Sequence, residues 1–249
     1  MTRLYPYIFK RRSVRKYNNE LEISKEELKL IEEKIAEVVP LFPEIKTEIV
    51  LAPVDKSTLK KGSHCILLYS QKEEGYTLNA GYMLEQLDLY LCSLNIGVCW
   101  YGLAKAKEKE RNGLPYVIML GLGKSEPEDF RSDIKDFNRK DISEIWQGEF
   151  SERVKTASSL APSACNSQPW IVKSSNEKIE VFRNTEPKTI IPKSHRPFFG
   201  GIDCGIYIFF LELALTANNF CFERSLYKNE AEENGLQKLA QYDMYDMFI

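Results

Sequence analysis

The chain carries GYMLEQLDLYLCSLN at residues 81–95 and, 124 residues later, GIYIFFLELALTANN at 205–219. Five of the 15 aligned positions are identical: Gly81/Gly205, Leu87/Leu211, Leu89/Leu213, Leu91/Leu215 and Asn95/Asn219. Apolar residues recur at helical spacing in both segments, which predicts two long core helices, one over about 78–97 that ends near Gly97 and one over about 202–218. Two similar helices in one chain indicate two related halves.

The sequence before each helix also matches, at an offset of 122 residues. VPLFPEIKTEIV (39–50) aligns with APSACNSQPWIV (161–172), and both read as a helix end, a proline, a loop and the start of a strand. Two matches in the same order predict a repeat over 1–150 and a second over 151–249. Chance similarity between apolar segments is the alternative.

The remaining pattern alternates helices and short strands. Ser24 and Glu27 form a capping box, which predicts a helix from Lys25 to Val39 that stops at Pro40. A helix is also expected from Ser151 until Pro162 breaks it, after a loop-rich stretch over 124–149. Strands are expected at 47–53, 64–70, 115–123, 169–175 and 178–184, with a last strand at 221–227. The fold class is therefore α+β, with two tandem intertwined repeats, each a central sheet flanked by helices.

Composition excludes several classes of protein. The 249 residues are 43% hydrophobic and 28% charged, and the net charge of −2 argues against a nucleic-acid binder. The start of the chain has no apolar run of signal-peptide length, and the apolar run Gly205–Ala217 contains Glu212, so it predicts a buried helix and no membrane span. The six cysteines form no CxxC pair, and the chain has two histidines, so we expect free thiols, no metal site and a cytoplasmic protein.

The densest chemistry lies in RRSVRKY (11–17). The guanidinium groups of Arg11, Arg12 and Arg15, with the hydroxyl of Ser13, can hold a phosphate and several polar oxygens at once. This stretch, called the basic strip below, predicts an anionic ligand. A solvated basic arm and a nucleic-acid tail are the alternatives.

A second candidate is PSACNSQPW (162–170), whose residues 163–168 are called the amide loop below. Its small residues Ser163 and Ala164 allow a ligand close to the backbone, and the amides of Asn166 and Gln168 offer donors and acceptors. An ordinary loop between a helix and a strand is the alternative.

A third candidate, GVCWYGL (97–103), could present backbone groups of Trp100, Tyr101 and Gly102 to a ligand, or serve as a turn after the core helix. GLGKS (121–125) fails as a phosphate loop because Ile118 stands where that motif needs glycine, and Glu126 breaks a dinucleotide-binding pattern. Neither histidine has the sequence spacing of a hydrolytic triad, so no catalytic side chain is proposed.

Together, RRSVRKY, the APSACNSQPW loop and the long helix closed by LNIGVCWYG resemble the FMN-dependent nitroreductase family. The resemblance implies an α+β fold with FMN between two intertwined subunits. It further implies that the basic strip holds the FMN phosphate, ribityl chain and ring edge, and that the amide loop reaches the same flavin from the partner. The residues that it implies for FMN binding are Arg11, Arg12, Ser13, Arg15, Ser163, Ala164, Asn166 and Gln168, with Trp100, Tyr101 and Gly102.

This chain departs from the family's usual pattern. The amide loop normally follows the basic strip after one helix, whereas here 155 residues separate Arg11 from Asn166. The first half has VPLFPEIKTEIV in place of the amide loop, and the second half has no basic strip. Each half keeps what the other lacks, which resembles a branch of the family with two intertwined repeats in one chain. We therefore expect a monomeric pseudo-dimer with one complete FMN site.

The resemblance implies an oxidoreductase that uses NAD(P)H to reduce nitroaromatics, quinones or similar flat acceptors by a ping-pong flavin mechanism. Arginine and backbone donors would stabilise negative charge at the edge of the reduced ring. Two alternatives stay open: a flavin-binding protein without turnover, for sensing or storage, and an interaction protein that uses the basic arm without flavin. Replacement of Arg11 or Arg15 by alanine is expected to weaken FMN binding while the fold stays intact.

Overall fold

The computed structural model describes residues 2–18, 20–228 and 230–245, which fall into two compact units. The first unit is Phe9–Asp136. The second unit combines Phe137–Ile249 with Met1–Ile8. The start of the chain thus groups with its C-terminal part, and the basic strip begins two residues after this shared segment.

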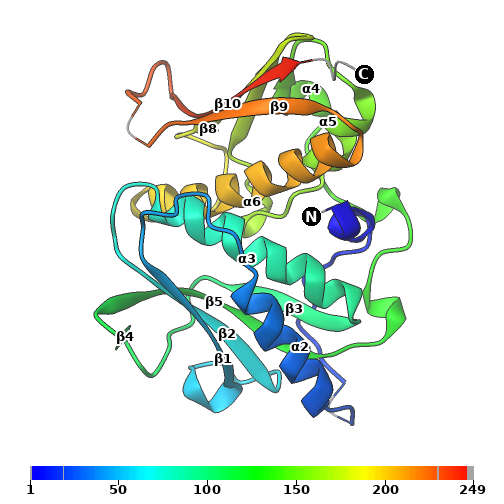
Figure 1. Cartoon of the computed structure of the whole chain (residues 1–249), viewed down its shortest axis with the longest axis vertical. Coiled ribbons are helices and arrows are strands. Elements are labelled where there is room, and N and C mark those ends of the chain that lie inside the picture. The colour runs from blue at the N-terminus through cyan, green and yellow to red at the C-terminus, as the bar shows by residue number, and fades with distance from the viewer. Residues whose placement is uncertain (1, 19, 229, 246–249) are drawn as a thin grey trace. The chain divides into compact units, whose positions relative to one another are not determined.

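The first unit is a sheet with a long helix across one face (Figure 1). Its helices are α2 (Lys25–Ala36) and α3 (Tyr76–Ser93), and its strands are β1 (Thr47–Pro53), β2 (His64–Ser70), β3 (Ile96–Tyr101), β4 (Glu110–Arg111) and β5 (Leu114–Lys124). The main strands pair in the order β1-β2-β5-β3, all antiparallel, and β4 pairs with β5.

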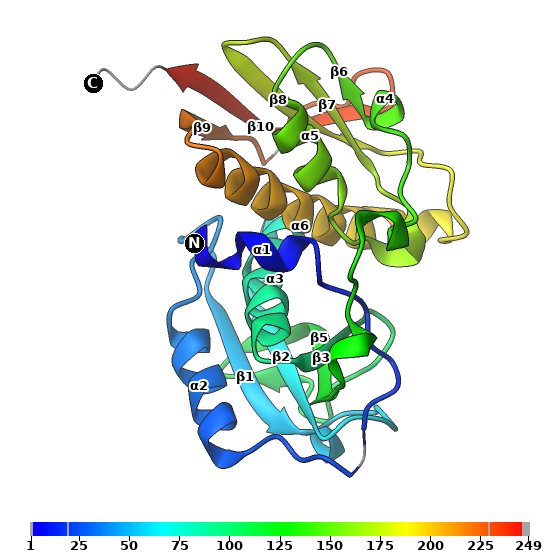
Figure 2. The ribbon, with the colours of Figure 1, turned by 90° about the vertical axis from the view of Figure 1, so that its right-hand side faces the viewer.

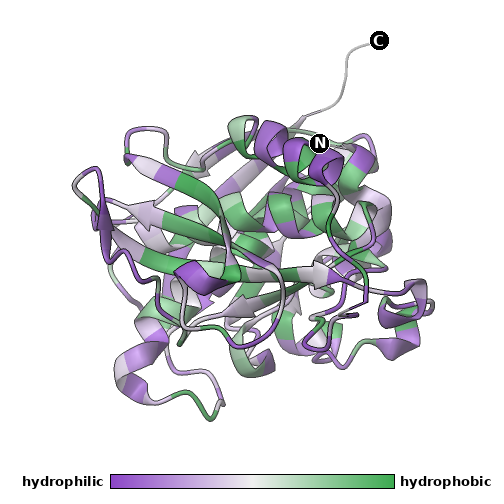
Figure 3. Ribbon diagram, turned by 90° about the horizontal axis from the view of Figure 1, so that it is seen from below, coloured by the Kyte–Doolittle hydropathy of each residue, from purple (hydrophilic) through white to green (hydrophobic). Residues whose placement is uncertain are grey.

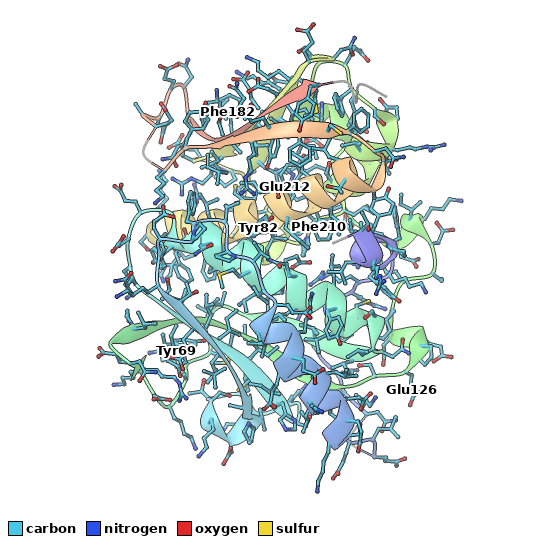
Figure 4. The ribbon with its side chains drawn as sticks, viewed as in Figure 1. Tyr69, Tyr82, Glu126, Phe182, Phe210 and Glu212 are labelled. Atoms are coloured by element: carbon cyan, nitrogen blue, oxygen red, sulfur yellow. The ribbon has the colours of Figure 1, made fainter. Side chains whose placement is uncertain are left out.

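The central strand β2 is buried on both faces. Cys65, Leu67 and Tyr69 alternate along it and form an apolar cluster with Met119 of β5 (Tyr69 is labelled in Figure 4). Because side chains on a strand alternate between faces, the intervening Ile66 and Leu68 pack on the opposite side. In Figure 3 the hydrophobic colour lies mainly on the strands and helices, and the loops are mainly hydrophilic.

The second unit is built around one long buried helix (Figure 2). Its helices are α1 (Tyr5–Ile8), α4 (Ile142–Ile145), α5 (Glu152–Ser159) and α6 (Arg196–Ala217), and its strands are β6 (Trp146–Gln147), β7 (Trp170–Ser174), β8 (Lys178–Asn184), β9 (Cys221–Leu226) and β10 (Leu236–Tyr245). The sheet order is β6-β7-β8-β10-β9, with β6 parallel to β7 and the other pairs antiparallel. Helix α1 packs on α6, where Asn218 donates a hydrogen bond to the Tyr5 hydroxyl (3.4 Å).

Helix α6 is the predicted buried helix. By length and composition alone the segment Lys193–Ala217 could cross a membrane, but 89% of its most apolar window is buried inside the protein. A core helix accounts for this apolar composition.

Four expected element boundaries were wrong. Helix α2 ends at Ala36 and not at Val39, because the residue before Pro40 avoids helical backbone. Helix α3 ends at Ser93, because Asn95 is left-handed (φ 54°) and the chain then enters β3, a strand where the sequence suggested a turn. Strand β9 is not the last strand, since β10 follows it and pairs between β8 and β9. Helix α6 begins at Arg196, six residues before the expected start.

The two units share an order of elements. The first runs α2, β1, β2, α3, β3, β5, and the second runs α5, β7, β8, α6, β9, β10. In both sheets the four main strands pair in the order first, second, fourth, third.

Candidate functional site

The basic strip lies along the edge strand β3. The backbone N–H of Val14 donates to the carbonyl of Val98 (2.8 Å), and Ser13 forms a parallel bridge with the same residue. Arg11 and Val14 are buried, Ser13 is half-buried, and Arg12 and Arg15 are exposed.

The Arg11 guanidinium lies in a buried ion cluster on α3. Its Nε is 2.9 Å from Asp88 Oδ2 and 3.7 Å from Glu85 Oε1, and the three side chains are 3%, 1% and 0% exposed. Arg11 Nη2 donates to Ser13 Oγ (3.2 Å), and Trp100 Nε1 donates to Asp88 Oδ2 (2.9 Å). Arg11 therefore anchors the strip to the helix, and its Nε is committed to carboxylates of the protein.

The carboxylates keep Arg11 charged. Burial alone would lower the pKa of Arg11, but Asp88 and then Glu85 more than offset it, so the pKa lies above its ordinary value. If one partner of such a buried ion cluster is removed, an uncompensated charge stays buried and the stability of the fold falls.

The outward cations of the strip are free for a ligand. Arg12 and Arg15 are exposed and make no hydrogen bond or ion pair with a described side chain. Arg131 lies beside the start of the strip: its backbone N–H donates to the Lys10 carbonyl (2.9 Å), and its Nη1 donates to the Arg11 carbonyl. Burial and the cations of Arg11 and Arg12 lower the pKa of Arg131 to about 10. An anion beside this cationic cluster would relieve the repulsion between its members.

The third candidate segment is divided by the pleat of β3. Trp100 points to Asp88 on the helix side of the sheet. Tyr101 packs with the cluster on the other face, where its ring covers Gly121 so closely that a Cβ there would lie 2.7 Å from it. The side chains of Trp100 and Tyr101 therefore lie on opposite faces of the sheet. A single ligand could meet both residues only through their backbone groups, next to the half-buried Gly102.

The amide loop has an unusual backbone. Cys165, Asn166 and Gln168 have φ of 50°, 54° and 44°, in the left-handed region that non-glycine residues rarely occupy. Such a conformation persists when surrounding contacts over-determine it. Cys165 and Asn166 are exposed at the tip of the loop, and Ser163 and Ala164 are half-buried.

One contact that holds the loop comes from α6. Asp203 is 3% exposed, and its two oxygens accept hydrogen bonds from Ala164 N (2.9 Å) and Ser167 Oγ (3.1 Å). Burial raises the pKa of Asp203 to about 7, although both hydrogen bonds act in the opposite direction. Next to the loop, Trp170 stacks on Tyr207 with ring centroids 4.8 Å apart.

The segment before α4 braces the loop from its other side. Gln168 is 1% exposed; its Oε1 accepts from Lys140 N (3.1 Å), and its backbone carbonyl accepts from Lys140 Nζ (3.0 Å). Asn166 is exposed, with its Oδ1 accepting from Arg139 Nη1 (3.0 Å) and its Nδ2 donating to the Asn138 carbonyl (3.0 Å). The Gln168 side chain therefore supports the loop, and Asn166 is the amide at its surface.

The residues that hold the two motifs were missed in the sequence. Asp88 and Asp203 could have been noticed as carboxylates inside apolar helices, where a buried charge needs a partner. Arg131, Arg139 and Lys140 lie in the charged stretch after β5, where nothing distinguishes them from solvated residues. Among the described residues no group of three or more His, Cys, Asp or Glu could hold a metal ion.

Two α+β units, each with a sheet and a long buried helix, have the fold of a nitroreductase-like oxidoreductase. A family profile described as "Putative TM nitroreductase" matches residues 3–215, and the chain belongs to that family. A crystal structure from Thermotoga maritima, described as that of a nitroreductase, is similar over 97% of this chain and 93% of that chain, with 17% identity and a TM-score of 0.63. This likeness confirms the predicted α+β, nitroreductase-like fold.

Shorter structures match about half of the chain. A nitroreductase family protein from Clostridium novyi covers 52% of this chain and 88% of its own, with 15% identity and a TM-score of 0.40. A protein titled NADH oxidase from Clostridium acetobutylicum covers 53% of this chain and 97% of its own, with 17% identity and a TM-score of 0.39. No curated protein matches the chain.

Proposed function

We propose that the chain is an FMN-dependent oxidoreductase that uses NAD(P)H to reduce nitroaromatic, quinone or similar flat acceptors in the cytoplasm. We further propose that it is a pseudo-dimer with one FMN per chain, which uses both the basic strip and the amide loop. The carrying observation is that each motif occurs once, and that a buried carboxylate on the long helix of its own unit anchors it: Asp88 for the strip and Asp203 for the loop.

The chemistry of the strip fits a flavin phosphate. Arg12, Arg15 and Arg131 supply three guanidinium groups, and the pKa of Arg131, about 10, is held below its ordinary value by burial and by neighbouring cations. A phosphate dianion accepts forked hydrogen bonds from such groups. We assign Arg12 and Arg15 to direct contacts, and Arg11 to the position of the strip.

The amide loop fits the polar edge of a flat ring. Its backbone is held in a left-handed path by buried contacts, so its exposed groups are fixed before a ligand arrives. Ser163 and Ala164 are small, half-buried residues, and Asn166 carries an amide at the exposed tip of the loop. Preorganised donors of this kind stabilise charge that develops during a reaction.

Duplication of the fold is supported by a contact that both units make. In the first unit Asn79 Oδ1 accepts from Phe42 N (3.1 Å), and in the second Asp203 Oδ1 accepts from Ala164 N (2.9 Å). Asn79 and Asp203 are 124 residues apart, and Phe42 and Ala164 are 122 apart, which are the two offsets of the sequence repeat.

A second matched contact follows each long helix. Asp88 on α3 accepts from Trp100 on β3, and Glu212 on α6 (labelled in Figure 4) accepts from Arg224 on β9 (2.8 Å), 12 residues further on in both cases. The left-handed Asn95 and Asn219 end the two helices, at φ 54° and 62°. Two matched contacts and a matched helix end support a duplicated unit in which Arg11 and Asn166 are retained parts of one site.

Bound FMN would supply the electron transfer chemistry, so the side chains have only to bind and orient it. Arg12 and Arg15 would neutralise the phosphate, and the backbone of the amide loop would face a polar edge of the ring. Arg11, Asp88 and Asp203 keep these groups in place without contacting the cofactor. No acid–base pair is required of the protein, in agreement with its lack of a recognisable triad.

The first test is the visible spectrum and flavin content of the purified protein. We expect one FMN per chain after release by denaturation, and bleaching of its absorbance on addition of NADH or NADPH without oxygen. A ratio near two would contradict the single-site pseudo-dimer, and a colourless protein that does not take up FMN would contradict the flavin assignment. Flavin binding without oxidation of either nucleotide would favour the storage or sensing alternative.

Arg12→Gln and Arg15→Gln are each expected to weaken FMN binding by about 10- to 100-fold, since a charge-assisted hydrogen bond contributes roughly 1.5–3 kcal/mol. Both side chains are exposed, so the fold should tolerate the changes. Flavin fluorescence titrations measure the effect. Arg153→Gln, an exposed arginine on α5, is the control and should bind FMN as the unchanged protein does. Equal affinities in all four proteins would show that the strip is a solvated arm.

A further inference from the structure

The second unit contains a cavity of about 130 Å³ beside the amide loop. Ser167 and Pro169 of the loop region form one wall, Arg183 and Asn184 at the end of β8 form another, and Arg196 and Gly200 of α6 form a third. A water molecule occupies about 30 Å³ in the liquid, so the volume suits an ion of a few heavy atoms.

Two arginines face this cavity without an ion-pair partner among the described residues. Arg183 Nη1 donates to the Pro197 carbonyl (3.3 Å), and Arg196 Nε donates to the Ile191 carbonyl (3.1 Å). Arg183 Nε is buried and has no hydrogen-bond partner. A buried N–H of a charged group without an acceptor is costly, and an anionic oxygen in the cavity would satisfy it.

The other lining groups suit an oxyanion. Asn184, Thr185 and Thr189 add neutral polar side chains to the wall. Among the described residues that line the cavity, Glu232 is the one carboxylate; it is exposed and forms no ion pair with either arginine, so solvent screens its charge. Two guanidinium groups against one solvated carboxylate leave a net positive site.

We propose that this cavity binds a tetrahedral oxyanion of phosphate size, either free phosphate or the phosphate group of a nucleotide. Arg183 would give its unpartnered Nε to one oxygen, and Arg196 would face the ion from α6. This site is separate from the basic strip and does not require that the protein bind flavin.

Calorimetric titration of the purified protein with sodium phosphate, at an ionic strength kept constant with sodium chloride, tests the proposal. We expect saturable binding, weakened about 10-fold or more by Arg183→Gln and by Arg196→Gln, as for loss of one charge-assisted hydrogen bond. Glu232→Gln should tighten binding, because it removes a negative charge from the wall. Arg153→Gln should leave the affinity unchanged.

Titrations with 2′-AMP and 5′-AMP separate the two sources of the ion. Tighter binding of either nucleotide than of phosphate, lost in Arg183→Gln, identifies a nucleotide phosphate; equal or weaker binding identifies the free ion. The cavity proposal is overturned if phosphate does not bind saturably, or if binding survives in Arg183→Gln and is lost in Arg12→Gln, which would assign the phosphate to the strip. Flavin content, measured on each variant, reports separately on the proposed function.

Discussion

Arg11→Met is expected to lower the free energy of unfolding by about 3–5 kcal/mol, the usual cost when one side of a buried ion pair is removed. The change leaves Asp88 and Glu85, 1% and 0% exposed, without their cation. It also removes a hydrogen bond to Ser13 in the middle of the strip. Urea denaturation at neutral pH, followed by circular dichroism, measures the loss.

Arg12→Met is the matched control, since it removes the same charge one residue away from an exposed position. We expect its effect to stay within about 0.5 kcal/mol. A triple change, Arg11→Met with Glu85→Gln and Asp88→Asn, should recover part of the loss, because no unpaired charge is then buried. If Arg11→Met and Arg12→Met are equally stable, Arg11 does not anchor the strip.

The burial of Arg11 revises the expectation that its replacement by alanine would leave the fold intact. A flavin titration on an Arg11 variant would measure folding and binding together. Arg12 and Arg15 are exposed, whereas Arg11 is buried against Asp88 of α3, so we propose direct phosphate contacts for Arg12 and Arg15 alone.

Some strands have the bounds that the sequence predicts. The strands at Thr47–Pro53 and His64–Ser70 match the expected ranges, because runs such as Cys65–Tyr69 are apolar and short and end at polar residues. Strands β3 and β10 were missed for opposite reasons. Strand β3 follows its helix so closely that only Leu94 and the left-handed Asn95 separate them, and β10 mixes polar with apolar residues because one face of it is only half-buried.

The sequence predicts the two motifs of the candidate site but not the residues that hold them in place. RRSVRKY and PSACNSQPW stand out because several polar groups lie close together in sequence. The residues that support these motifs do not stand out, because they are distant in sequence. Asp88 is 77 residues from Arg11, and Asp203 is 39 residues from Ala164. Such contacts depend on which side of a helix faces the motif, and a single sequence does not state that. The support that the Gln168 side chain gives to the loop was not predicted for the same reason, since its partner Lys140 lies in an unpatterned loop.

Asp203→Ala should destabilise the amide loop, because the change removes the acceptor of both Ala164 N and Ser167 Oγ. Each buried donor left unpaired costs roughly 1–3 kcal/mol, so for two donors we expect a loss of about 2–6 kcal/mol in unfolding free energy. Hydrogen exchange of the amides over 163–168 should rise most, since this segment has the strained backbone. Thermal or urea denaturation gives the global effect.

The Asp203→Asn variant is expected to differ in stability from the unchanged protein by an amount that depends on pH. The pKa of Asp203 in the folded protein is about 7, above the ordinary 3.8. Between these values the folded state keeps a proton that the unfolded state has lost, so this group's contribution to stability falls as pH rises from about 4 to 7. The slope is at most about 1.4 kcal/mol per pH unit. Asparagine carries no charge, so the variant should gain stability relative to the unchanged protein over that range and hold the gain above pH 7.

The first unit supplies the reciprocal experiment, because Asn79 already occupies the matching position with an uncharged amide. Asn79→Asp buries a carboxylate at a position that is 0% exposed and removes the donor to the Phe42 carbonyl. We expect this variant to lose stability as pH rises, in the opposite direction to Asp203→Asn. Denaturation curves for the three proteins at several pH values between 4 and 8 make the comparison. Parallel pH profiles for the unchanged protein and Asp203→Asn would show that Asp203 does not titrate in this range. Its role would then be limited to accepting the two hydrogen bonds that shape the loop.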